Sequence, residues 1–199
     1  MARGSRERRD HRGPPRRASD HLSGSGPVLR AARPSDLRHL ASVEEAGGAL
    51  FREHLDHLPP ALTGPAPTGG ERADQPGHLL VAVVDGEVVG FAHVVLLDDG
   101  HETRAHLEQV SVLPAHGRRG TGARLVQAAA EEARWDGFGE LSLCTYRDVP
   151  WNAPFYARLG FEVVQPVGVL AELRAREQER GLDEAGERVV MRLVLRRQE

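Results

Sequence analysis

Lysine is absent from the chain, whose 26 basic residues are all arginine. This absence excludes a lysine nucleophile, a lysine Schiff base and the phosphate loop GxxxxGK[ST] from these 199 residues. Cysteine occurs once, as Cys144, so no disulfide can form within the chain and we expect a reducing, cytoplasmic compartment. Apolar runs stay well short of the roughly 18 residues that a membrane span needs, so we expect a soluble protein with no membrane partner.

Aromatic residues are also scarce, at 5% of the chain, whereas 40% of the residues are hydrophobic. The core is therefore expected to consist largely of Leu, Val and Ala. A length of 199 residues fits one domain of ordinary size with a tail to spare.

The first 27 residues have the composition of a disordered tail, because large aliphatic side chains are almost missing from them. Seven arginines against three acidic residues give this tail a net charge of +4, which leaves −7 for the rest of a chain whose formal total is −3. Neither pair of adjacent arginines leads into an apolar stretch, so we expect no export signal. The predicted division is a tail at 1–27 and a domain at 28–199.

Strands and helices are predicted to alternate from Val28 onward. The turn Asp85-Gly86 between two apolar runs is the clearest hairpin signal. Residues 59–77 contain so much proline and glycine that we expect a long irregular loop, of the kind that often forms a lid. The predicted strands are 28–32, 79–84, 87–97, 105–113, 141–146, 161–165 and 188–195, and the predicted helices begin near 34 and cover 50–58, 120–136, 151–159 and 169–180.

The segment from Val110 to Gly122 combines a strand, a glycine-rich turn and the start of a helix. Pro114 ends the strand because it has no N–H to donate, and three glycines and two arginines precede the helix. Glycine lets backbone N–H groups approach an anion, and a helix N-terminus adds unpaired donors. The pattern favours a pyrophosphate site, although a glycine-rich turn before a helix is by itself more often simple turn chemistry.

A second motif is the run Asn152-Ala153-Pro154-Phe155-Tyr156-Ala157-Arg158-Leu159-Gly160-Phe161. It is typical of a short helix that ends at Gly160, with Asn152 and Tyr156 four residues apart and so on one helix face.

Together, VSVLPAHGRRGTGARL and NAPFYARLGF resemble the two signature segments of the GNAT superfamily of acetyl-CoA-dependent N-acetyltransferases. The first is similar to a strand, a proline and (Gln or Arg)-x-x-Gly-x-Gly, and the second to Tyr-x-x-x-Gly-Phe. The resemblance covers about residues 28–166 in element order. It implies a mixed α/β (α+β) fold, with one splayed β-sheet of about six to seven strands flanked by helices. One departure is visible, because Gly117 stands where the family has Gln or Arg.

The resemblance also implies how acetyl-CoA would be held as a co-substrate. Pantetheine would run along the strand segment Val110, Ser111 and Val112, whose backbone N–H would hold the acetyl carbonyl. The pyrophosphate would lie on backbone amides of the following loop, with the two arginines substituting for the missing side chain. The loop residues concerned are Gly117, Arg118, Arg119, Gly120, Thr121 and Gly122.

Two side chains are candidates for proton transfer. Tyr156 matches the family's usual general acid, which would protonate the leaving thiolate. The acceptor amine is mostly protonated at neutral pH, so a base or a water chain must take its proton. A period of two puts Glu108 on the face of Val110 and Val112, which makes Glu108 the first choice for the base, with His106 second.

Other interpretations remain open for several residues. Glu108 could instead pair with an arginine, and Asn152 could hold either pantetheine or the helix N-terminus. Cys144 is expected to be a buried structural thiol, and the histidines show no metal-ligand spacing, so we expect no metal. The acidic domain slightly favours a cationic acceptor, but the amine itself is unknown, and a homodimer is left open.

Two alternative functions are kept beside the transferase: a sensor that binds acetyl-CoA without turnover, and a nucleic-acid-associated protein that uses its arginine-rich tail. The tail lacks interleaved aromatic residues and the domain is acidic, which disfavours nucleic acid. The C-terminal stretch from Leu170 to Met191 is expected to close the acceptor side of the sheet.

Overall fold

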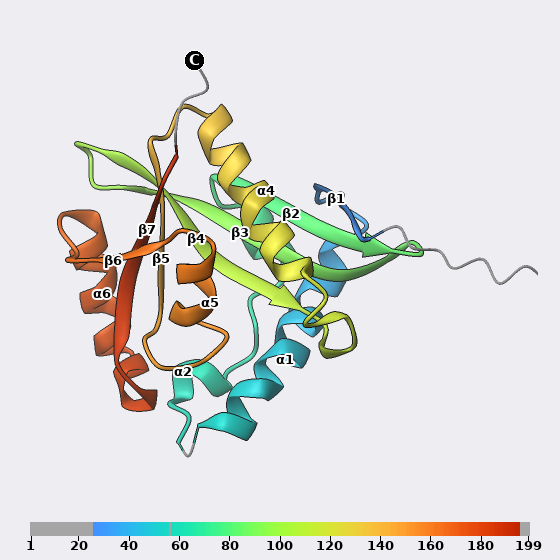
Figure 1. The fold of residues 1–199 in the computed structure, drawn as a ribbon, viewed down its shortest axis with the longest axis horizontal. Helices are drawn as coiled ribbons and strands as arrows, with labels where there is room; N and C mark the ends of the chain where they lie inside the picture. Colours follow the sequence, from blue (N-terminus) through green and yellow to red (C-terminus); the bar gives the residue numbers. More distant parts are fainter. Residues whose placement is uncertain (1–25, 56, 196–199) are drawn as a thin grey trace, which may run out of the picture.

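A computed structural model describes residues 26–55 and 57–195, which form a seven-stranded sheet with helices on both faces (Figure 1). The strand order is β1-β2-β3-β4-β5-β7-β6, which confirms the predicted mixed sheet. All but the last two residues of the predicted tail lie outside the described residues. The strands are β1 (Val28–Ala31), β2 (Gly77–Val84), β3 (Glu87–Asp98), β4 (Thr103–Val112), β5 (Glu140–Tyr146), β6 (Glu162–Val164) and β7 (Arg188–Val194).

Helices cover both faces of the sheet. On one face, here called the α4 face, Leu125 and Ala129 of α4 pack on strand residues such as Leu107 and Leu143, and α5 joins the same core. On the other, here called the α1 face, Leu40 of α1 packs on Phe91, and α6 packs on β7. The helices are α1 (Leu37–His54), α2 (Pro60–Thr63), α3 (Gly69–Ala73), α4 (Thr121–Trp135), α5 (Ala153–Arg158) and α6 (Val169–Glu179), with 3₁₀ turns at Pro114–His116 and Leu182–Ala185.

The β2–β3 hairpin is confirmed at the predicted turn. Asp85 and Gly86 have φ of 51° and 87°, the positive values that a type I′ turn requires. No helix among residues 26–55 and 57–195 has the length and apolar character to cross a membrane.

Two predictions about the first helices were wrong. The predicted second helix near residue 50 is the continuation of α1, because the apolar contacts of Leu40 and Val43 offset the weak helix propensity of Gly47 and Gly48. The region 59–77 is not fully irregular, since it contains α2 and α3. The start of α3 is fixed by a capping box in which Thr68 and Glu71 exchange hydrogen bonds, a four-residue signal that is present in the sequence.

The sheet opens between β4 and β5. These parallel strands pair at only two positions, Ala105 with Leu141 and His106 with Ser142, although both strands continue well beyond. Past His106, the backbone groups of β4 that face β5 have no strand partner, and in a strand these are every second residue. This opening is the predicted splay, and it places unpaired N–H groups next to the segment Val110 to Val112.

Candidate active site

Glu108 lies at a β-bulge, which changes the face it occupies. His93 of β3 is opposite Gln109 while Val94 is opposite Leu107, so Glu108 is the extra residue of β4. Val110 and Val112 pack in the core of the α4 face. Glu108 instead approaches His106 and the charged groups of the α1 face. The prediction that Glu108 shares a face with Val110 was therefore wrong, because the bulge interrupts the period of two.

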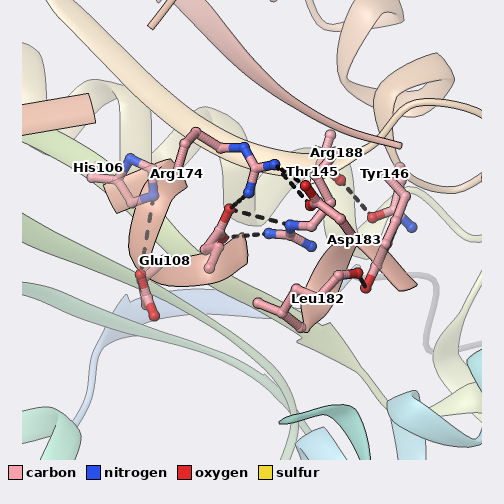
Figure 2. Close-up of polar contacts among 10 residues, drawn as sticks. His106, Glu108, Thr145, Tyr146, Arg174, Leu182, Asp183 and Arg188 are labelled. Atoms are coloured by element: carbon pink, nitrogen blue, oxygen red, sulfur yellow. Dashed lines mark hydrogen bonds and ion pairs between the residues drawn. The ribbon is translucent and has the colours of Figure 1, made fainter. Parts of the chain in front are cut away.

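His106 is the last residue of β4 that pairs with β5. Figure 2 shows its ring beside Glu108. His106 is 2% exposed, and its Nδ1 lies 2.9 Å from the Oγ of Ser142. Burial lowers the pKa of His106 from the usual 6.5 to about 4, so the imidazole is neutral at pH 7. A buried imidazole with so low a pKa is poorly suited to act as the base, for which His106 was the second candidate. Its contact with Ser142 stabilises the last pair between the two strands.

Glu108 has no direct ion pair with an arginine in the described part of the chain. Its carboxylate instead approaches the neutral imidazole of His106, whose Nε2 lies 4.0 Å from Oε2. The side chain is 47% exposed, yet desolvation by the surrounding protein, followed by the charge of Glu177, raises its pKa above the usual range. A carboxylate with a raised pKa is better matched to accepting a proton near neutral pH.

The surroundings of Glu108 include a network of ion pairs that sequence reasoning missed (Figure 2). Arg188 donates to Glu177 at 2.5 Å, and Arg174 donates to Glu177 at 2.6 Å and to Asp183 at 2.7 Å. Arg188 also lies over the ring of Tyr146. The network ties α6 to β7 beside the opening of the sheet. It joins residues of separate elements, so the sequence did not predict the network. The only related prediction was that the C-terminal stretch closes the acceptor side of the sheet.

The loop before α4 presents a row of unpaired backbone donors. The N–H groups of residues 118–123 make no hydrogen bond within the described residues. Arg118 and Gly120 have positive φ, of 56° and 80°, which curls the loop in front of the helix N-terminus. Such consecutive N–H groups at a helix N-terminus form an anion site. Gly117 does not contribute its N–H, which donates to the Pro114 carbonyl, so the predicted set of amides begins one residue later.

The other predicted cofactor residues lie around this loop. Thr121 is buried, and Gly122 faces the ring of Phe155 in α5. The side chains of Arg118 and Arg119 are exposed and without a carboxylate partner in the described chain. Ser111 is buried on the α1 face, where its Oγ accepts a hydrogen bond from Gln109.

Tyr156 lies on the α4 face, in α5. Its ring packs edge-on against Phe155 and Phe161, and burial raises its pKa to about 12. Within the described residues, no hydrogen-bond partner engages its hydroxyl. The phenol therefore stays protonated over the whole physiological range, with its proton uncommitted.

Asn152 precedes α5, but its side chain does not cap the helix. Its Oδ1 instead accepts a hydrogen bond from Thr145 of β5 at 2.5 Å, while its backbone carbonyl accepts from the N–H groups of Phe155 and Tyr156. The Asn152 side chain therefore does not cap the helix, which was one of its two predicted roles. Asn152 anchors the start of α5, and so Tyr156, to the far strand of the opening.

Cys144 fits the structural role expected of it. It is half-buried on the α1 face, and burial raises the pKa of its thiol to about 12, so it is not a thiolate at neutral pH. Among the residues that the structure describes, no three His, Cys, Asp or Glu side chains gather where they could hold a metal ion.

Two buried histidines should make the fold sensitive to acid. Burial lowers the pKa of His93 and His106 to about 4, so between pH 6.5 and 4 the unfolded chain binds more protons than the folded one. We expect the free energy of unfolding to fall with decreasing pH in this window, by up to roughly 1.4 kcal/mol per pH unit for each histidine. Urea unfolding between pH 4 and 7.5 measures this pH dependence. The slope of the unfolding free energy against pH should be smaller in His93→Gln and unchanged in His101→Gln, which replaces an exposed histidine. An unchanged slope in His93→Gln would contradict the prediction.

The arrangement can be compared with known proteins. The family model described as "Acetyltransferase (GNAT) family" matches residues 44–161, which include both sides of the opening, the loop and α5. The chain belongs to the GNAT family. A GNAT acetyltransferase from Brucella melitensis, solved in complex with acetyl-CoA, is 27% identical, with a TM-score of 0.52 over 68% of this chain and 82% of that one.

Two other similar proteins are less similar in sequence or share less of the chain. The ribosomal-protein-S18-alanine N-acetyltransferase of Escherichia coli is 17% identical, with a TM-score of 0.58 over 87% of this chain and 96% of that one, a likeness of fold. A mycothiol acetyltransferase of Amycolatopsis mediterranei is 38% identical over 96 residues, 48% of this chain. That match spans about a quarter of the mycothiol enzyme, 27% of its length.

Proposed function

We propose that the chain is an acetyl-CoA-dependent N-acetyltransferase that transfers the acetyl group to a primary amine by direct attack. One observation carries the proposal: Glu108 and Tyr156 lie on opposite faces of the sheet, on either side of the opening between β4 and β5. A base on one face and an acid on the other suit a reaction in which an amine arrives from one side and a thiol leaves on the other.

Acetyl-CoA fits the groups that surround the opening. The free N–H groups of residues 118–123 suit the pyrophosphate, and exposed Arg118 and Arg119 add positive charge. The unpaired backbone of β4 suits the amide-containing pantetheine arm. The relative from Brucella, at 27% identity, was solved with acetyl-CoA, which supports the same co-substrate here.

The chemistry then divides between the two faces. On the α1 face, Glu108 pairs with the incoming ammonium and takes a proton, so that the amine nitrogen can attack the thioester carbonyl. A β4 N–H aimed at the carbonyl oxygen stabilises the oxyanion that develops. When the C–S bond breaks, the Tyr156 hydroxyl donates a hydrogen bond to the departing CoA sulfur, on which the negative charge builds.

Tyr156 has a higher pKa than a thiol in water. A phenol with a pKa of about 12 is a weaker acid than a thiol with a pKa near 8.5, so full transfer in water would be uphill. The same burial that raises the pKa of Tyr156 also disfavours the thiolate, which narrows the difference. Tyr156 therefore acts mainly by donating a strong hydrogen bond as negative charge builds on sulfur.

The test is CoA release over a panel of amines, with acetyl-CoA binding measured on the same sample. Release with at least one amine and no release without an acceptor are expected. Tight binding without release from any amine would support the sensor instead. The panel includes the acceptor of mycothiol acetyltransferases, because two of these enzymes share local sequence with this chain.

A matched pair of glycines tests the phosphate loop. Gly120 and Gly137 flank α4, both with positive φ (80° and 90°) and with open space where a Cβ would lie. Replacing either with alanine should cost similar stability, about 1 kcal/mol, from backbone strain. Only Gly120→Ala should weaken acetyl-CoA binding, by about tenfold, measured by calorimetry. Equal affinities of the two variants would rule out this loop as the phosphate site.

The remaining features of the proposal concern the whole chain. We propose one catalytic domain over 28–199 that works in the cytoplasm. The nucleic-acid alternative depends on the arginine-rich tail, most of which lies outside the described residues, and salt-dependent binding to random-sequence DNA would be its test.

A further inference from the structure

Three buried polar groups form a chain that ends at the carboxylate of Glu108. The Oγ of Ser142 lies 3.1 Å from the carbonyl oxygen of Ala105 and 2.9 Å from Nδ1 of His106. On the other side of the imidazole ring, Nε2 lies 4.0 Å from Oε2 of Glu108, the contact that Figure 2 marks between these two residues. Ala105, Ser142 and His106 are each at most 4% exposed, so bulk water does not compete for their hydrogen bonds.

These contacts determine which ring nitrogen of His106 carries the proton. The Ala105 carbonyl has no proton to give, so the Ser142 hydroxyl donates to it. The Ser142 oxygen is then an acceptor for His106, which must donate from Nδ1. A neutral imidazole has one N–H, and burial keeps His106 neutral at pH 7 by lowering its pKa to about 4. Nε2 therefore faces Glu108 with a lone pair.

A lone pair in this position distinguishes the two forms of Glu108. The ionised carboxylate has no proton to share with Nε2, and 4.0 Å leaves no room for a bridging water. After Glu108 has taken a proton from the amine, its acid O–H can turn to Nε2 and form a hydrogen bond.

We propose that His106 is a positioning residue whose Nε2 lone pair, fixed by Ser142, accepts a hydrogen bond from Glu108 once Glu108 has taken the proton of the acceptor amine. The chain thereby makes Glu108 a stronger base, while His106 itself stays neutral throughout. The proposal rests on the proposed function and assigns to His106 a role other than that of the base.

Charged groups around Glu108 act on it as well. Desolvation and Glu177 raise its pKa, and three arginines lower it. The charged or titratable groups that face Glu108 from other elements are Glu44 of α1, Arg72 of α3, His93 of β3, Glu177 of α6, Arg180 at the end of α6 and Arg188 of β7. The effect of His106 depends on the place of one proton and not on net charge, so it can be removed while all these charges stay.

Asparagine at position 106 would remove the atom that faces Glu108. Its shorter amide can still reach Ser142 but has no atom at the place of Nε2. Because the protonated form of Glu108 loses its acceptor, the acidic limb of kcat/KM in His106→Asn should move to lower pH by about 0.5–1 unit, the size of one hydrogen bond between neutral groups. On the plateau kcat/KM should fall about threefold, since the base is weaker. An NMR titration of the Glu108 carboxyl carbon without acetyl-CoA should show the same shift.

Ser142→Ala tests the tautomer without touching the residue that faces Glu108. Without the hydroxyl, Nδ1–H loses its acceptor, and the ring can instead carry its proton on Nε2 and donate to the carboxylate. Two-bond proton–nitrogen NMR correlations of His106 should therefore change from Nδ1–H in wild type to Nε2–H, and the acidic limb should again move to lower pH. Cys144→Ala is the matched control. Cys144 lies two residues further along β5 and packs with apolar side chains on the α1 face, so this variant should keep both the limb and the tautomer.

Each outcome decides the role of His106. A wild-type ring with its proton on Nε2 would overturn the proposal, as would an acidic limb of His106→Asn that stays in place or moves to higher pH. If His106 only packed in the sheet, His106→Asn would lower the melting temperature and leave the Glu108 titration unchanged. Should this variant fail to fold, the titration and tautomer in Ser142→Ala decide alone. If no amine released CoA, the proposed function would fail, whereas the NMR results would still test the chain.

Discussion

Glu108→Gln should lower kcat/KM for amine acetylation by about 10²–10⁴-fold, the usual contribution of a general base. The amide keeps the shape of the carboxylate but cannot take the proton of the ammonium. Acetyl-CoA binding should not change, because Glu108 lies on the face opposite α4. Steady-state CoA release and calorimetry on the same preparation measure both quantities.

The pH profile makes the prediction for Glu108 sharper. Activity requires the carboxylate form, so kcat/KM should rise with pH through the pKa of Glu108, which desolvation places above the usual range of glutamate. The residual activity of Glu108→Gln should lack this acidic limb. Glu45→Gln, which removes an exposed carboxylate from α1, is the control and should keep both rate and profile. A wild-type acidic limb that persists in Glu108→Gln would assign the base to another group.

Tyr156→Phe should lower kcat by roughly 10²-fold, at the low end for general acids because a thiolate is a good leaving group. The hydroxyl has no hydrogen-bond partner in the described residues, so its removal should change the free energy of unfolding by less than about 0.5 kcal/mol. Because its pKa is raised to about 12, Tyr156 should produce no alkaline limb below pH 10 in the wild-type profile.

The only other tyrosine of the chain is the control for Tyr156. The Tyr146 hydroxyl donates to the Leu182 carbonyl, so Tyr146→Phe should lose about 1 kcal/mol of stability and keep kcat near the wild-type value. If Tyr156→Phe left acetyl-CoA binding and kcat both unchanged, the thiolate would be protonated by solvent and the assignment of Tyr156 would be wrong.

Local signals in the sequence predicted much of this fold. The hairpin at Asp85-Gly86 and the amphipathic α4 were predictable because a turn type and a helical period are set by neighbouring residues. The continuity of α1 through Gly47 and Gly48 was not, because contacts with distant strands stabilise it against local propensity.

The candidate site divides in the same way. The loop before α4 and the helix of Tyr156 follow from contiguous motifs, and the family match includes both. The face of Glu108 was predicted wrongly because a bulge depends on how β3 and β4 pair, which the period of two does not reveal. The ion pairs of Arg174 and Arg188 were not predicted, because which arginine pairs with which carboxylate depends on tertiary structure.

The two-residue junction between β4 and β5 divides the sheet into leaves of four and three strands. A ligand bound in the opening as proposed would make the hydrogen bonds that β4 and β5 do not make with each other, and would act as an additional strand. Occupancy then stabilises the fold by mass action and should slow hydrogen exchange along the open edge of β4. A co-substrate bound in this way would complete the hydrogen bonding of the sheet, and the fold would be most stable with the ligand bound.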